Sequence, residues 1–220
     1  MTPNPLLIAD RLASIRMDLP QEVTLVAVSK TKPVELLAEA LDAGQLDLGE
    51  NRTQEMAQKA AHFDRSDIRW HHIGHLQTNK VKQVVPHAHL IHAVDSRRLL
   101  DEIDKRSRNA NRNSSVLLQL HIAQETQKHG LDDQGLETLL ESLATHPLTN
   151  TVVQGLMGMA TFTDDTSQVT REFKRLRKQF DALNPGGWTT CSMGMSGDWK
   201  IAVDEGSTLV RIGSAIFGER

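Results

Sequence analysis

Residues 25–32 read LVAVSKTK, and this stretch decides the predicted fold. Its first four residues are apolar, which is typical of a strand buried on both faces in a parallel sheet. The strand runs directly into Ser29 and Lys30. In α/β folds, ligands collect at the carboxyl ends of strands, where loops are rigidly held but open to solvent. Desolvation there favours the neutral amine, so Lys30 is a candidate nucleophile toward an aldehyde. The simpler alternative is that it begins a solvated loop.

The composition indicates an ordinary globular protein. A chain of 220 residues predicts one domain spanning residues 1–220, and single α/β barrels of this size are common. The formal charge of -3 and the pI near 6.4 provide no positive electrostatic field that would attract nucleic acid. No apolar run is long enough for a membrane span, and the charged, amphipathic start predicts an unexported protein. The lone Cys191 allows no internal disulfide, so we expect a cytoplasmic location.

Eight strand-like segments alternate with helix-like segments along the chain. An amphipathic helix over 5–17 precedes them. The predicted strands are 25–28, 46–49, 70–74, 90–94, 116–122, 151–157, 189–193 and 209–212. The predicted helices that follow the first seven are 33–44, 53–61, 75–85, 96–108, 132–145, 167–183 and 198–205. This alternation predicts an α/β fold, a single (β/α)8 TIM barrel with an additional N-terminal helix.

Glycine and serine follow the last two predicted strands. The segment CSMGMSGDW places Ser196 between a strand and a helix, and Gly213 and Ser214 follow the final strand. Backbone N–H groups and hydroxyls in such turns bind anions. A single Gly-Ser pair usually marks only a turn, but two of them after the seventh and eighth strands match the phosphate site of such barrels.

Arg211 lies within the apolar final strand. A guanidinium is always charged, so it must meet a buried acceptor or a ligand there. A salt bridge inside the barrel and a ligand contact remain equal alternatives. A desolvated lysine, an anion cradle and this arginine together describe a site for pyridoxal 5'-phosphate (PLP) held as a Schiff base.

The sequence resembles the YggS/PROSC family of pyridoxal phosphate homeostasis proteins, relatives of the barrel domain of alanine racemase. Five segments carry the resemblance nearly from end to end. They are AVSKTKP around Lys30, GENRTQE from Gly49, WHHIGHLQTNK from Trp70, GLMGMA from Gly155, and SMGMSGDWKIAVDEGSTLVRIGSAIFG from Ser192.

The resemblance implies a role for each of six cofactor-binding residues. Lys30 would be the Schiff-base lysine, and Arg211 would lie near the pyridine nitrogen. Ser196, Gly213 and Ser214 would contact the phosphate, and Asn51 would lie beside the ring. Ser214 stands where the family often has threonine, and His72 stands where it usually has phenylalanine or another ring.

The sequence predicts a binding protein without catalytic residues. Racemases that resemble this barrel use a tyrosine from a second domain as a base, whereas this chain has no tyrosine. An arginine at the ring nitrogen leaves that nitrogen unprotonated, which makes the ring a poor electron sink. We expect intracellular PLP homeostasis by a monomer, with PLP-dependent apo-enzymes as recipients. The alternatives are a small racemase or lyase that uses His72 or Cys191 as its base, and an aldolase-type barrel without a cofactor.

No metal site is predicted. His71, His72 and His75 are close in sequence, but His71 and His72 lie on opposite faces of a strand and His75 follows a glycine. One face of the strand therefore cannot gather all three imidazoles.

Overall fold

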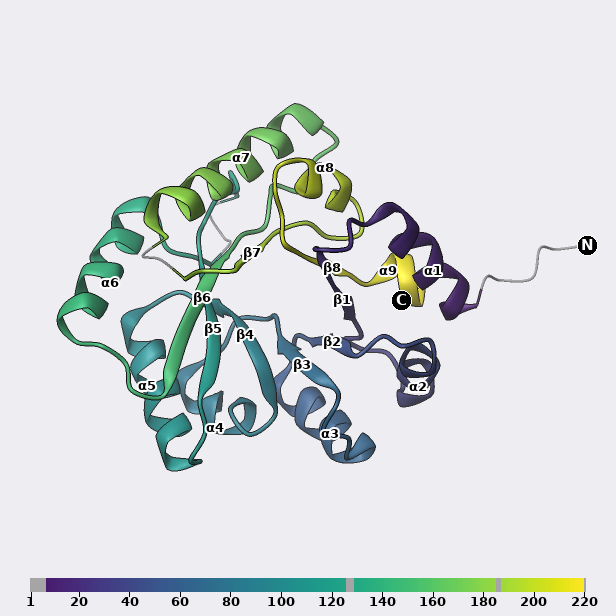
Figure 1. Ribbon diagram of the computed structural model, residues 1–220, viewed down its shortest axis with the longest axis horizontal. Helices are drawn as coiled ribbons and strands as arrows, with labels where there is room; N and C mark the ends of the chain where they lie inside the picture. The colour runs from purple at the N-terminus through teal and green to yellow at the C-terminus, as the bar shows by residue number, and fades with distance from the viewer. Residues whose placement is uncertain (1–6, 126–128, 185–186, 220) are drawn as a thin grey trace, which may run out of the picture.

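The computed structural model describes residues 7–125, 129–184 and 187–219. Eight parallel strands close into a barrel in sequence order, with helices around the outside (Figure 1). The strands are β1 (Thr24–Val28), β2 (Asp47–Glu50), β3 (Arg69–His72), β4 (Ala88–Val94), β5 (Ser114–Gln119), β6 (Thr151–Met157), β7 (Thr190–Ser192) and β8 (Leu209–Ile212). The predicted fold class is confirmed. We call the carboxyl ends of the strands, with the loops that follow, the mouth, and the amino ends the base.

Two groups of buried residues form the core. The larger group packs between the strands and the helices, where Ala27 and Ile212 lie among leucines and valines from both layers. The smaller group fills the barrel interior and includes Val26 of β1 and Leu209 of β8. Neighbouring residues of one strand therefore point to opposite faces, as the pleat requires. Because both faces of the barrel sheet are covered, strands such as residues 25–28 are apolar at consecutive positions.

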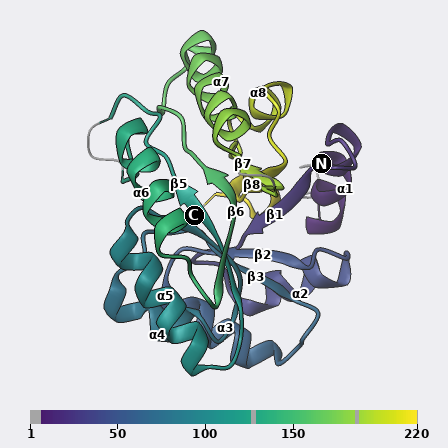
Figure 2. The same ribbon diagram turned by 60° about the vertical axis from the view of Figure 1, so that its left-hand side comes forward.

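Helices follow the strands and cover the barrel (Figure 2). They are α1 (Ile8–Asp18), α2 (Val34–Asp42), α3 (Thr53–Phe63), α4 (Val81–Val84), α5 (Arg97–Asn109), α6 (Asp133–Thr145), α7 (Thr166–Leu183), α8 (Trp199–Asp204) and α9 (Ser214–Phe217), with a 3-10 turn η1 (Thr78–Lys80). The N-terminal helix is confirmed, although its predicted start at Pro5 lies outside the described residues. Among the described residues, no helix is both long and apolar enough to cross a membrane.

Two helices differ from the prediction. The helix expected over 75–85 is only η1 followed by α4. The short helix α9 was not predicted, and it packs against α1, where Arg11 Nη1 donates to the Ile216 carbonyl at 3.0 Å. Four-residue segments such as α9 are too short to carry a helical hydrophobic period.

Candidate functional site

The residues predicted to bind the cofactor all lie on one side of the mouth. The closed barrel places β7, β8, β1 and β2 next to one another. The six residues are Lys30 after β1, Asn51 after β2, Ser196 after β7, Arg211 within β8, and Gly213 and Ser214 directly after β8. We call this side of the mouth the β7–β2 arc.

Arg211 points into the barrel and is only 4% exposed. Its Nη1 donates to Ser192 Oγ, and its Nη2 donates to the Gly158 carbonyl at 3.0 Å. Burial lowers the pKa of Arg211 to about 10, so the guanidinium stays charged near neutral pH. Among the described residues, the Asp198 carboxylate exerts a favourable electrostatic effect on Arg211, so the ion-pair and ligand alternatives both stay predictions. A buried guanidinium is costly unless polar groups surround it, and an acceptor atom of a ligand would add to its contacts with Ser192 and Gly158.

Two turns meet beside the end of β8. The Ser196 Oγ accepts a hydrogen bond from the Gly213 N–H at 3.1 Å, so the loops after β7 and β8 are joined directly. Gly194 has a φ of +95°, and a Cβ there would lie 2.6 Å from the Ala202 Cβ of α8. Only glycine permits this path. Ser214 is exposed at the start of α9. The predicted meeting of the two Gly-Ser turns is therefore present.

Lys30 lies in a strained turn. It is half-buried, and Thr31 has a φ of 65°, in the left-handed region that β-branched residues rarely adopt. The residues on either side of Lys30 are held by side chains from other elements. Ser29 Oγ donates to Glu50 Oε1 at 2.6 Å, and the Thr31 N–H donates to Glu55 Oε1 at 2.6 Å. Surrounding bonds of this kind are what allow strain to persist at functional positions.

Lys59 completes this support from α3. Its Nζ contacts Glu50 Oε1 at 2.7 Å, Glu55 Oε1 at 2.8 Å and the Ser29 carbonyl at 2.8 Å. Glu50 is fully buried and Lys59 is 5% exposed. Burial raises the pKa of Glu50, against the opposing effect of Lys59 and Ser29. Sequence reasoning missed the contacts of Lys59 with Glu50 and Glu55. The spacing of four residues between Glu55 and Lys59, which places both on one face of α3, was the available signal.

Asn51 is exposed after β2 and lies against Gly74 from the loop after β3. A Cβ at Gly74 would overlap both the backbone and the side-chain oxygen of Asn51. The glycine in the segment WHHIG therefore allows the two loops to approach each other.

A chain of polar side chains runs inside the barrel from Arg211 to the base. Beyond Ser192, His92 Nδ1 lies 3.3 Å from Ser192 Oγ, and His92 Nε2 lies 2.9 Å from His71 Nδ1. His71 Nε2 lies 3.0 Å from Asp47 Oδ1, beside a cavity of about 670 Å³ at the base. Burial lowers the pKa of His92 well below its usual value, so this ring is neutral.

The charged side chains at the two ends of this hydrogen-bonded path, Asp47 and Arg211, set the direction of its hydrogen bonds. A carboxylate only accepts, so His71 Nε2–H donates to Asp47. When His71 is neutral, its Nδ1 accepts from His92 Nε2–H, and His92 Nδ1 accepts from the Ser192 hydroxyl. Arg211, which only donates, then donates to Ser192 Oγ. This sequence of bonds orients the Arg211 guanidinium.

Comparisons with known proteins show the family to which the chain belongs. The family model described as alanine racemase, N-terminal domain, matches residues 7–220. A protein of Aquifex aeolicus is 39% identical over 199 residues, and one of Escherichia coli is 38% identical over 210 residues. Both are named pyridoxal phosphate homeostasis protein, and the matches cover 89% and 91% of this chain and 86% and 87% of those proteins. The chain belongs to this homeostasis family.

Solved structures extend the comparison. PipY of Synechococcus elongatus, solved with PLP bound, is 37% identical and superposes with a TM-score of 0.89. That match covers 96% of this chain and all of PipY (100%). An alanine racemase of Clostridium difficile shares the fold at 13% identity and a TM-score of 0.77, and this chain spans 60% of its length. The predicted membership of the homeostasis family is thus confirmed.

This homeostasis-family chain buries both residues that the racemase or lyase alternative would use as a base. Cys191 is 0% exposed, and burial raises the pKa of its thiol to about 12. His72 is also 0% exposed, and burial lowers its pKa to about 4. Neither ring nitrogen of His72 has a hydrogen-bond partner among the described residues. Neither side chain can reach a substrate from these positions.

Proposed function

We propose that this protein binds PLP through a Schiff base on Lys30 and exchanges it, without amino-acid turnover, in intracellular PLP homeostasis. The names of its relatives and the PLP-bound structure of PipY support this assignment. When bound, PLP supplies a reactive aldehyde, an aromatic ring and an anionic phosphate. The residues of the β7–β2 arc suit each of these parts.

The observation that carries the proposal is the buried charge of Arg211 within β8, beside the two joined Gly-Ser turns. A group with an anionic tail and an acceptor nitrogen would satisfy both the guanidinium and the turns beside it. Ser196, Gly213 and Ser214 would hold the phosphate through hydroxyl and amide donors. Asn51 would lie beside the ring. Arg211 would face the ring nitrogen, for which it has only donors to offer.

Lys30 is well placed as the attachment point because its turn is held by Glu50, Lys59 and Glu55. A held turn limits the orientations of the amine, so less entropy is lost on binding. A proton-free ring nitrogen would make carbanion chemistry unfavourable. Together with the lack of tyrosine and the burial of His72 and Cys191, this supports a binding role rather than an enzymatic one.

We further infer a cytoplasmic monomer that passes PLP to apo-enzymes. The buried, lone Cys191 fits a reducing compartment. A cofactor held by one lysine at an open barrel mouth can exchange with other amines, which supports transfer.

The test uses the full-length protein. After incubation with PLP and gel filtration, we expect one retained PLP per chain, with visible absorption that Lys30→Ala removes. Incubation of the loaded protein with D- and L-amino acids should give no sustained turnover by chiral chromatography. Failure to retain PLP would overturn the binding assignment. Continued conversion of any amino acid would overturn the non-enzymatic one.

A further inference from the structure

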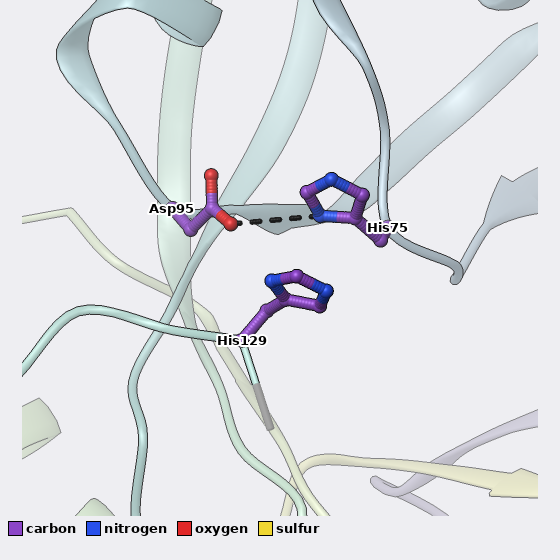
Figure 3. A group of neighbouring side chains, drawn as sticks. All are labelled: His75, Asp95 and His129. Atoms are coloured by element: carbon purple, nitrogen blue, oxygen red, sulfur yellow. Dashed lines mark ion pairs between the residues drawn. The ribbon is translucent and has the colours of Figure 1, made fainter. Parts of the chain in front are cut away.

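Three potential metal ligands meet on the side of the mouth opposite the predicted phosphate turns. His75 follows β3, Asp95 follows β4, and His129 lies in the connection between β5 and α6 (Figure 3). Ligand atoms from all three lie within 4.8 Å of one another. The rings of His75 and His129 are stacked, with centroids 4.0 Å apart and planes inclined by 16°. We call these residues the His-Asp cluster.

The spacing within the His-Asp cluster fits a shared ion better than a direct hydrogen bond. His75 Nδ1 and Asp95 Oδ2 are 3.6 Å apart, as the dashed line in Figure 3 marks. That separation is too long for a hydrogen bond. Two ligands with bonds of about 2.1 Å to one tetrahedral ion lie about 3.4 Å apart. The ligand atoms lie within 4.8 Å of one another, so the third must move inward by up to about 1.4 Å, which requires an exposed imidazole to rotate out of the stack.

The backbone positions of the His-Asp cluster are held by the barrel. Gln119 Nε2 donates to the His129 carbonyl at 2.7 Å. A bridge between Leu120 and Leu131 then returns the loop to the end of β5. Asp95 directly follows the buried end of β4. The three side chains can therefore rotate while their backbones stay at the mouth.

The donor set indicates the class of metal. Two imidazoles and one carboxylate suit Zn²⁺ and similar divalent transition metals rather than Ca²⁺ or Mg²⁺. The only ion-pair partner of Asp95 among the described residues is His75. A carboxylate supplies negative charge to a bound cation, and imidazole nitrogens supply neutral lone pairs. Three protein ligands leave at least one coordination position open.

We propose that His75, Asp95 and His129 form a binding site for a divalent transition metal ion, with Zn²⁺ as the preferred probe. This inference does not depend on the PLP assignment. In the structure, Asp95 and His129 lie beside His75. The sequence had suggested only His71 and His72 as neighbours of His75, and neither belongs to the cluster. The open position on the ion would face the mouth.

The test is isothermal titration of tag-free, metal-free, full-length protein with Zn²⁺. We expect one site per chain, with affinity lowered at least tenfold in His75→Ala, Asp95→Asn and His129→Ala. The matched control is His62→Ala, an exposed histidine on α3 outside the cluster, which should bind Zn²⁺ as the parent does. Circular dichroism checks that each variant is folded.

Lys30→Ala should also retain Zn²⁺ binding, which separates this site from any chelation by PLP. Absence of Zn²⁺ binding by the parent would overturn the proposal. Equal binding by the three cluster variants, or equal loss in His62→Ala, would also overturn it.

Discussion

The two sides of the mouth use the same sheet edge differently. On the β7–β2 arc, the site residues are held by buried contacts, as Arg211 is by Ser192 and the Lys30 turn is by Glu50 and Lys59. On the side of β3 to β5, the His-Asp cluster has two exposed imidazoles and a half-buried carboxylate. The difference shows that buried contacts support Arg211 and the Lys30 turn, whereas the His-Asp cluster has exposed side chains on backbones held by the barrel.

Breaking the support under Lys30 should have the largest effect. Lys59→Met leaves the buried Glu50 carboxylate without its cation, so we expect a loss of about 3–5 kcal/mol in the free energy of unfolding. Urea denaturation measures it. The matched control is Lys200→Met, whose ion pair with Asp18 is exposed and should contribute about 0–1 kcal/mol. A loss in Lys59→Met no larger than in this control would show that the buried Glu50–Lys59 pair does not support the Lys30 turn as proposed.

Reversing the charge at Arg211 tests the ligand side of the same arc. Arg211→Glu should lower PLP affinity about a hundredfold, because a carboxylate repels the phosphate and can share a proton with the ring nitrogen. Absorption titration measures the affinity, and transamination side reactions should become faster. Arg211→Lys keeps the charge and should lose less affinity. Unchanged spectra and rates in Arg211→Glu would contradict the place assigned to Arg211.

Replacement of His72 on β3 should increase the stability of the protein. His72→Phe replaces a buried ring that has no hydrogen-bond partner, so we expect a gain of about 1–3 kcal/mol at neutral pH. Urea denaturation again provides the measurement. His87→Phe, at a half-buried position, is the control and should bring no such gain. A loss of stability in His72→Phe would show that the His72 ring is satisfied.

The pH dependence of stability sharpens the test of His72. Its pKa falls from 6.5 to about 4 on folding, so the unfolded chain binds the proton first as pH decreases. Above pH 6.5 the ring is neutral in both states, and as the pH falls toward 4, protonation of the unfolded chain lowers the stability by about 3 kcal/mol. His72→Phe should flatten this part of the profile. An unchanged slope between the two pH values would contradict the assignment.

Removal of one phosphate donor should have the smallest effect. Ser196→Ala deletes a hydroxyl together with its hydrogen bond from the Gly213 N–H, so PLP affinity should fall about tenfold while attachment to Lys30 persists. Equilibrium dialysis measures the affinity. The control is Ser66→Ala, at an exposed position between α3 and β3, away from the turns after β7 and β8. Equal affinity in the two variants would exclude Ser196 from the phosphate contacts.

Sequence patterns predicted local features well. The predicted sixth and eighth strands coincide with β6 and β8, and the predicted start of the helix over 96–108 matches α5, which Ser96 caps by accepting from the Leu99 N–H at 3.4 Å. These features depend on neighbouring residues, so a short window contains most of their signal, although the predicted strands 70–74 and 116–122 begin later and end later than β3 and β5. The glycine and serine turns after β7 and β8 were also found in this way.

Contacts between distant segments could not be predicted. The path from Arg211 to Asp47 and the His-Asp cluster each require separate strands to come together before their members meet. The Glu50–Lys59 pair requires α3 to pack back against the end of β2. The His-Asp cluster combines residues 75, 95 and 129, which share no sequence period. Arg211 was recognised as a buried charge, but its contacts with Ser192 and Gly158 emerged only from the fold.

The most direct test of the central claim is the site of covalent attachment. The PLP-loaded protein is reduced with borohydride, digested and mapped by mass spectrometry. We predict a single stoichiometric pyridoxyl phosphate adduct on the peptide that contains Lys30, and none in Lys30→Ala. An adduct mainly on another lysine, or no adduct in a protein that retains PLP, would contradict the account.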